Sequence, residues 1–187
     1  NAQSLTLTAF VVDTTAPTIT NVTSSTPNGT YITGQSVSIQ VSFSETVIVS
    51  GTPQLTLETG TSDAVADFAS GSNSDTLTFT YTIGANQNSS DLDYASTSAL
   101  SLNSGSIVDT SGNSATLTLA SPSEANSLGN NKDLVIDTTA PTITGVTSST
   151  ADGSYKSGQS VTILVAFDDT VIVDITGGTP ILLMNNG

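Results

Sequence analysis

The chain has 187 residues and a formal net charge of −14, with two lysines as its only basic residues and no cysteine, histidine or tryptophan. Nucleic acids and anionic membrane surfaces would repel so acidic a chain, and no segment approaches the roughly 18 apolar residues of a membrane-spanning helix. Nucleophilic catalysis by Ser–His or Cys–His pairs is excluded by composition, and we expect neither nucleic-acid binding nor membrane insertion.

Apolar and polar residues alternate along most of the chain, and this period of two predicts β-strands. In chain order the alternation covers residues 37–43, 55–57, 77–81 and 117–119. Segments rich in Gly, Asn and Ser, which favour turns, separate these runs. Only Ser123–Leu128 has a pattern compatible with one helical turn. The sequence therefore predicts an all-β protein, an antiparallel sandwich of about seven to nine short strands.

An internal repeat is the strongest feature of the sequence. The segment Asp13–Thr20 (DTTAPTIT) recurs unchanged as Asp137–Thr144, and shorter identities continue over about fifty residues. We predict three parts: residues 1–12 as the tail strand of a preceding repeat, 13–136 as one complete β-sandwich repeat, and 137–187 as the N-terminal part of the next. The N-terminal residues lack a secretion-signal pattern, which predicts mature or internal sequence.

Two aspartates mark the repeat boundaries. Asp13 and Asp137 each precede Thr-Thr-Ala-Pro. One interpretation is a turn in which the aspartate bonds its own backbone and the proline stiffens the linker. The other is Ca²⁺ coordination at the junction, because Ca²⁺ prefers six to eight hard oxygen ligands. Glu45 and its counterpart Asp169 follow the strand at residues 37–43 and its copy, at a rim where a linker could meet them.

Two further acidic segments are candidates for metal binding. Asp91 and Asp93 flank Leu92, so an extended backbone places both carboxylates on one side. Such a pair of like charges is costly without a cation, and the chain has few lysines to offer. Asp109 begins the segment Asp-Thr-Ser-Gly-Asn, which is either an oxygen-rich metal loop or an ordinary turn closed by the aspartate side chain.

Several segments together resemble a known bacterial repeat. Val12–Pro17 looks like the linker of Ig-like and cadherin-like repeats in giant adhesins. Phe43–Glu45, Gly51–Leu55, Leu77–Tyr81, Asp91–Tyr94 and Asn126–Gly129 resemble the repeat associated with a cyanobacterial swimming-motility surface protein. The resemblance covers nearly all of residues 13–136. It implies an extracellular array on a bacterial cell surface, in which Asp13 and Asp137, and next Glu45 and Asp169, bind structural Ca²⁺.

Three functions remain open from the sequence. The first is a calcium-stiffened stalk of a large adhesin, whose partners are neighbouring repeats and whose surface ligand is unknown. The second is a fibre or sheath subunit completed by strand exchange between identical chains, because residues 137–187 supply too few strands for a sandwich. The third is a carbohydrate-binding module, which the scarcity of aromatic residues disfavours. We expect no enzymatic activity, because paired carboxylates that cleave sugars usually have aromatic or basic residues beside them to hold the sugar, and the chain has no tryptophan, histidine or arginine.

Overall fold

The computed structural model describes residues 12–185, which form eleven strands and one four-residue helix. This composition confirms the predicted all-β class. The chain divides into two compact units, the first ending at Thr138 and the second beginning at Thr139. In residues 12–185, no helix combines the length and the apolar character needed to cross a membrane.

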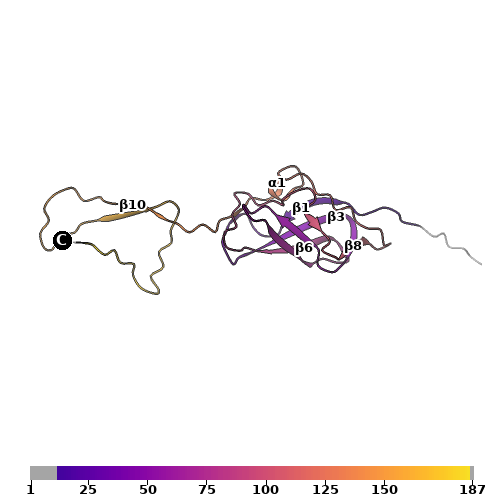
Figure 1. The fold of residues 1–187 in the computed structure, drawn as a ribbon, viewed down its shortest axis with the longest axis horizontal. Coiled ribbons are helices and arrows are strands. Elements are labelled where there is room, and N and C mark those ends of the chain that lie inside the picture. Colours follow the sequence, from indigo (N-terminus) through magenta and orange to yellow (C-terminus); the bar gives the residue numbers. More distant parts are fainter. Residues whose placement is uncertain (1–11, 186–187) are drawn as a thin grey trace, which may run out of the picture. The chain divides into compact units, whose positions relative to one another are not determined.

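Seven strands of the first unit are hydrogen-bonded into one antiparallel sheet (Figure 1). They are β1 (Ile19–Ser24), β3 (Ser36–Ser50), β4 (Gln54–Leu57), β5 (Ala64–Ser70), β6 (Ser74–Thr82), β7 (Leu100–Ser101) and β8 (Ser106–Asp109). Their order is β1-β3-β6-β5-β4-β7, and β8 also pairs with β3. The strands predicted at residues 37–43, 55–57 and 77–81 are confirmed as parts of β3, β4 and β6.

The long strand β3 makes the sheet curl. Its first half pairs with β1 on one edge and with β6 on the other, whereas Val47–Ser50 pair with β8. The register between β3 and β6 shifts between Ser42 and Val47. Such an irregularity bends a strand and increases its twist. The strands consequently form one sheet that curls on itself around a core.

The core lies on the face where the period of two places the apolar residues. Val37, Ile39 and Val41 of β3 are fully buried, and the partner strand β6 contributes Phe79, which packs edge-to-face on Phe68 of β5 at a centroid distance of 6.0 Å. Burial of such alternating side chains is the main stabilising contribution of a half-buried sheet.

A short parallel pair joins the two ends of the first unit. Strand β2 (Gly29–Tyr31) pairs in parallel with β9 (Leu134–Ile136). The helix α1 (Leu128–Asn131) precedes β9, and the Ser127 side chain caps it by accepting a hydrogen bond from the Asn130 N–H.

Two local predictions were wrong. The helical turn expected at residues 123–128 forms later, as α1, because Ser123 and Asn126 have φ values of 64° and 71°, which a right-handed helix does not allow. The alternation at residues 117–119 does not make a strand. Leu119 is buried and its N–H donates to Thr97 O. The N–H of Thr116 donates to Pro17 O, which belongs to a different segment. The side chains alternate as predicted without a continuous ladder.

The second unit contains one hairpin-like pair, β10 (Ile143–Ser148) and β11 (Ile163–Phe167). Its register, Ile143 opposite Phe167 and then a shift before Gly145, matches the pairing of Ile19 with Phe43 and the shift before Asn21 in the first unit. The register of this strand pair is thus the same in both copies of the repeated sequence.

Candidate metal site

Asp109 ends strand β8 and is held by its own turn. Its carboxylate accepts hydrogen bonds from the backbone N–H groups of Ser111 and Asn113, both at 2.8 Å, and from Asn113 Nδ2 at 2.7 Å. Burial of this side chain, which is 1 % exposed, would raise its pKa, but these hydrogen bonds outweigh burial and lower the pKa of Asp109 below its ordinary value. Asp109 therefore closes a turn with its own side chain, and these hydrogen bonds hold its carboxylate in place and favour the ionised form.

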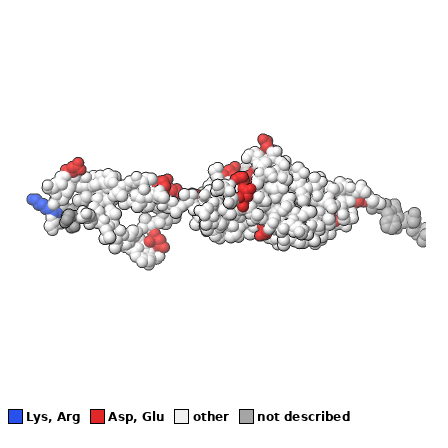
Figure 2. Space-filling view, viewed as in Figure 1, with Lys and Arg blue, Asp and Glu red and all other residues white. Residues whose placement is uncertain are grey.

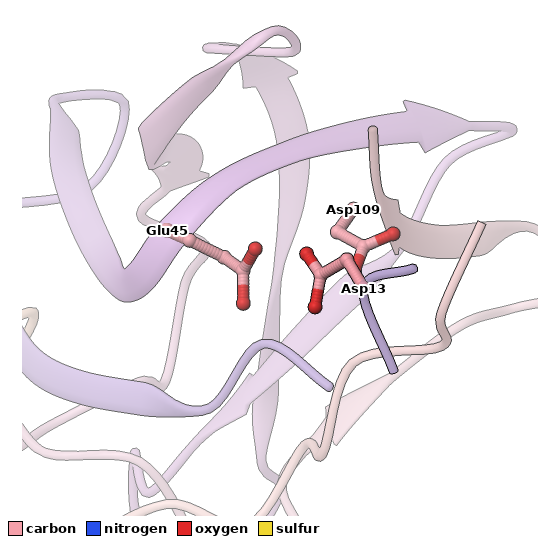
Figure 3. Close-up of side chains that lie close together, drawn as sticks. All are labelled: Asp13, Glu45 and Asp109. Atoms are coloured by element: carbon pink, nitrogen blue, oxygen red, sulfur yellow. The ribbon is translucent and has the colours of Figure 1, made fainter. Parts of the chain in front are cut away.

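Glu45 lies in the stretch of β3 where the register with β6 shifts, and its side chain is half-buried. Figure 3 shows the Glu45 carboxylate pointing toward those of Asp13 and Asp109. Partial burial raises the pKa of Glu45, and the negative charges of Asp13 and Asp109 raise it further. The negative charge of an ionised Glu45 is therefore unfavourable at this position, and a bound cation would offset it.

Asp13 is positioned by the segment that leads into β1. Its Oδ1 accepts the N–H of Thr15 at 2.9 Å, and its backbone carbonyl accepts Asn113 Nδ2 at 3.1 Å. Further on, Thr18 exchanges hydrogen bonds with Ser44, the residue before Glu45. These contacts fasten the segment between the bend of β3 and the turn after β8, and so bring Asp13 beside the other two carboxylates.

The three side chains form one group that could hold a metal ion. Asp13, Glu45 and Asp109 each offer one carboxylate oxygen, and these oxygens all lie within 4.8 Å of one another (Figure 3). Ca²⁺ binds oxygens at about 2.3–2.6 Å, so two oxygens on one ion are at most about 5 Å apart. Three carboxylates with no nitrogen or sulfur ligand are a donor set for a hard cation.

No lysine balances these charges. None of the three carboxylates makes an ion pair within residues 12–185, and the face of the first unit drawn in Figure 2 carries acidic side chains but no basic one. Three carboxylates alone would supply fewer than the six to eight oxygens that Ca²⁺ usually takes, so a bound Ca²⁺ would need further ligands from water or carbonyl oxygens.

The predicted pair Asp91 and Asp93 lies elsewhere in the first unit. Both approach Gly129, where an added Cβ would lie 3.0 Å from Asp93 Oδ2 and 3.4 Å from Asp91 Oδ2. Asp93 is buried, and its oxygens accept the backbone N–H groups of Tyr94 and Ser123. Desolvation and the nearby charges of Asp133 and Asp93 raise the pKa of Asp91. The structure gives Asp93 a structural role in fastening the loop at Ser123.

The second-copy candidates belong to different units. Asp137 is half-buried at the end of the first unit, where its N–H donates to Tyr31 O. Asp169 is exposed in the second unit, and its Oδ1 accepts the N–H of Thr170. Neither lies in a group of three potential ligands within the described residues.

Sequence reasoning named all three members of the group and placed Glu45 at a rim where a linker could meet it, but it did not bring Asp109 to this place. The missing information was the bend of β3, which turns Glu45 toward β8. It also missed Asn113 as the residue that links Asp13 to Asp109, although the spacing of Asp109, Gly112 and Asn113 was a usable signal for such a turn.

Comparison of the chain with protein-family models, with curated proteins and with solved structures found no match.

Proposed function

We propose that the chain is a stretch of tandem extracellular β-sandwich repeats of the Ig-like type, which act as a calcium-stiffened stalk of a large bacterial surface protein. The observation that carries this proposal is the group Asp13, Glu45 and Asp109. In this group, Asp13 from the start of the repeat lies beside Glu45 of β3 and Asp109 of β8.

The repeated sequence supports an array of similar units. Thr142 donates its N–H to Asp168 at 2.7 Å, at the position where Thr18 donates to Ser44 in the first unit. The same local hydrogen bonds and the same strand register recur after an identical linker sequence. A chain built of such copies would gain length in equal steps, as stalks do.

A cation in the group would act as a cross-link. Asp13 is exposed and lies where the chain enters the repeat, whereas Asp109 is buried in the turn after β8. An ion shared by both would transfer a pulling force from the entering chain directly to the body of the sheet. Since the chain has no cysteine, no disulfide can perform this task.

The proposal includes no catalytic role. The hydrogen bonds of its turn lower the pKa of Asp109 and favour its ionised form, and no histidine or cysteine exists in the chain to act beside it. The carboxylates are therefore assigned to cation binding alone.

The decisive experiment is thermal unfolding of the chain with excess Ca²⁺ and again with excess chelator. Binding to the folded state alone stabilises it by about 2.7 kcal/mol when free Ca²⁺ is about a hundredfold above Kd. For a domain of this size the melting temperature should rise on the order of 10 °C. The rise should be lost in Asp13→Asn and in Glu45→Gln, which remove charge and preserve shape.

Asp63→Asn is the matched control, because Asp63 is an exposed carboxylate outside the group. It should retain the full effect of Ca²⁺. An equal rise in all three variants would place any bound Ca²⁺ elsewhere, and no rise in the unchanged chain would reject the calcium-stiffened stalk.

A further inference from the structure

The chain enters and leaves the first unit at opposite ends (Figure 1). At the entry, Thr18 O accepts the N–H of Ser44 at 2.8 Å, where β3 bends. At the exit, the N–H of Asp137 donates to Tyr31 O at 3.0 Å, and Tyr31 precedes the turn that leads into the start of β3. Tension along the chain therefore acts along the strand axes of this unit.

The last strand of the unit is hydrogen-bonded on both edges. Strand β9 lies between the parallel strand β2 and the antiparallel segment 88–92. Ile136 and Ser89 exchange both backbone hydrogen bonds, at 2.8 and 2.9 Å, and the N–H of Leu92 donates to Leu134 O at 2.8 Å. The side chains of Leu134 and Ile136 are buried in the core. The strand by which the chain leaves is thus fastened on two sides and by its side chains.

Tension loads the pair of β2 and β9 in shear. Both strands run in the same direction, toward the exit. A pull at Asp137 draws β9 along its own axis, whereas a pull at the entry holds β2 back through β1 and the sheet. The two strands must slide past each other, so the hydrogen bonds between them have to break together. Strands separated from one end would lose the same bonds one after another, at a lower force.

We infer that β9, with its partners β2 and segment 88–92, is a mechanical clamp that sets the force at which the first unit unfolds under tension. The entering strand β1 has six residues and β9 has three, so β9 is the shorter of the two strands through which the chain is pulled. Its release uncovers Leu134 and Ile136 and opens the core. The use of this clamp in the protein rests on the proposed stalk function, whereas the clamp itself needs no Ca²⁺.

The test is single-molecule force spectroscopy of the full chain in chelator. The chain has no cysteine, so pairs of exposed residues can be changed to cysteine and coupled to handles in the reduced state. Thr14→Cys with Ala140→Cys loads the first unit along the chain. Asn28→Cys with Asp133→Cys pulls apart the adjoining N-terminal ends of β2 and β9, and so separates the strands from one end. Because forced unfolding follows the unfolding barrier along the direction of pull, we expect a rupture force at least about twofold higher for the first pair.

Two variants test the assignment to β9 with the first pair of handles. Asn88→Ala removes the acceptor that the Thr138 N–H reaches at 2.7 Å, beside the end of β9, and should lower the rupture force. Gln54→Ala is the matched control: it removes a hydrogen bond of 2.8 Å to Asp67, between β4 and β5, and should leave the force unchanged.

Rupture of the clamp should release the chain between the outer handles in a single step of roughly 40 nm, because an extended residue spans about 3.3–3.6 Å. Equal forces for the two directions of pull, or a main step that leaves β9 bound, would overturn the clamp. The handle at residue 14 lies after Asp13, and no Ca²⁺ is present, so the result does not depend on the cation site. A direction-dependent force in a chain whose melting temperature ignores Ca²⁺ would keep the clamp and reject the stiffening by calcium.

Discussion

The side-chain amide of Asn113 donates a hydrogen bond to the backbone carbonyl of Asp13, at 3.1 Å and across 100 residues of sequence. The same nitrogen also lies 2.7 Å from Asp109 Oδ2. Asn113 therefore holds two members of the acidic group in place, although it contributes no carboxylate itself. This makes it a positioning residue for the site.

Asn113→Ala should lower the melting temperature by several degrees in chelator and should also reduce the further rise produced by Ca²⁺. The first effect follows because a buried carboxylate loses a hydrogen-bond donor. The second follows because Asp13 is no longer held beside Asp109. Thermal unfolding of both states measures the two effects, with the exposed Asn130→Ala as a control that should change neither. An unaltered response to Ca²⁺ would show that Asn113 does not position the site.

The site illustrates what the sequence could predict. Glu45 and Asp109 were identified as candidates because the alternation of residues 37–43 and the Gly-Asn turn are local signals. Their proximity depends on a bend in β3 between Ser42 and Val47, which no local pattern records. Position along a strand is thus predictable here, whereas the meeting of distant strand ends is a property of the whole sheet.

The same contrast separates the correct strand predictions from the missed ones. Strand β5 was not predicted because alanine and serine weaken its alternation, although its Asp67 accepts a hydrogen bond from Gln54 Nε2 of β4 at 2.8 Å. In the second unit, residues 153–155 repeat β2 but form no strand. Their counterpart pairs with β9, and short strands are stable only with a partner.

The pH dependence of stability should reveal the charge repulsion at Glu45. Its pKa in the folded protein is raised above 4.5, so the folded state binds a proton more tightly than the unfolded state. The stability that this proton contributes is fully present below pH 4.5 and is lost as the pH rises through the raised pKa of Glu45. In chelator, the unchanged chain should therefore lose stability over this window relative to Glu45→Gln.

Melting temperatures measured from about pH 3 to about pH 7 give this difference directly. Asp109 has the opposite sign: its lowered pKa contributes stability above pH 3.8 that is lost as pH falls through the folded value. Saturating Ca²⁺ should remove the loss of stability that the ionisation of Glu45 causes as the pH rises. Parallel curves for the unchanged chain and Glu45→Gln would contradict the proposed repulsion.

Tyr94 should contribute to stability through its buried hydroxyl, which donates to Ala120 O at 2.8 Å. Tyr94→Phe leaves this carbonyl without its donor and should cost about 1 kcal/mol in chemical unfolding. Tyr31→Phe is the control: its hydroxyl bonds Pro27 O only four residues away, in a position that water reaches, so its loss should cost less. Equal costs would show that burial of the Tyr94 hydroxyl is unimportant.

Tyr94 also makes an alkaline prediction. Burial, and then the charge of Asp93, raise the pKa of Tyr94 to about 12. Since the folded-state pKa is raised, stability is fully present below about pH 10 and is lost as pH rises toward about 12. Tyr94→Phe should flatten this alkaline loss. Ultraviolet absorbance of tyrosinate should show one fewer late-titrating tyrosine in the variant.

Amide hydrogen exchange should differ between the two copies of the same sequence. Residues 39–41 of β3 pair with β1 on one edge and with β6 on the other, and should exchange only when the first unit unfolds. Within residues 12–185, their counterparts 163–165 pair with β10 alone, and the side chain of Val165 is exposed. Their exchange should be faster by orders of magnitude, although local sequence and register match.

Mass spectrometry of proteolytic fragments resolves the two segments within one sample, so solution conditions are identical. Comparable protection of both would mean that β11 already has a strand on its second edge in solution. Faster exchange at 163–165 than at 39–41 would show that the same strand register does not by itself give the same protection.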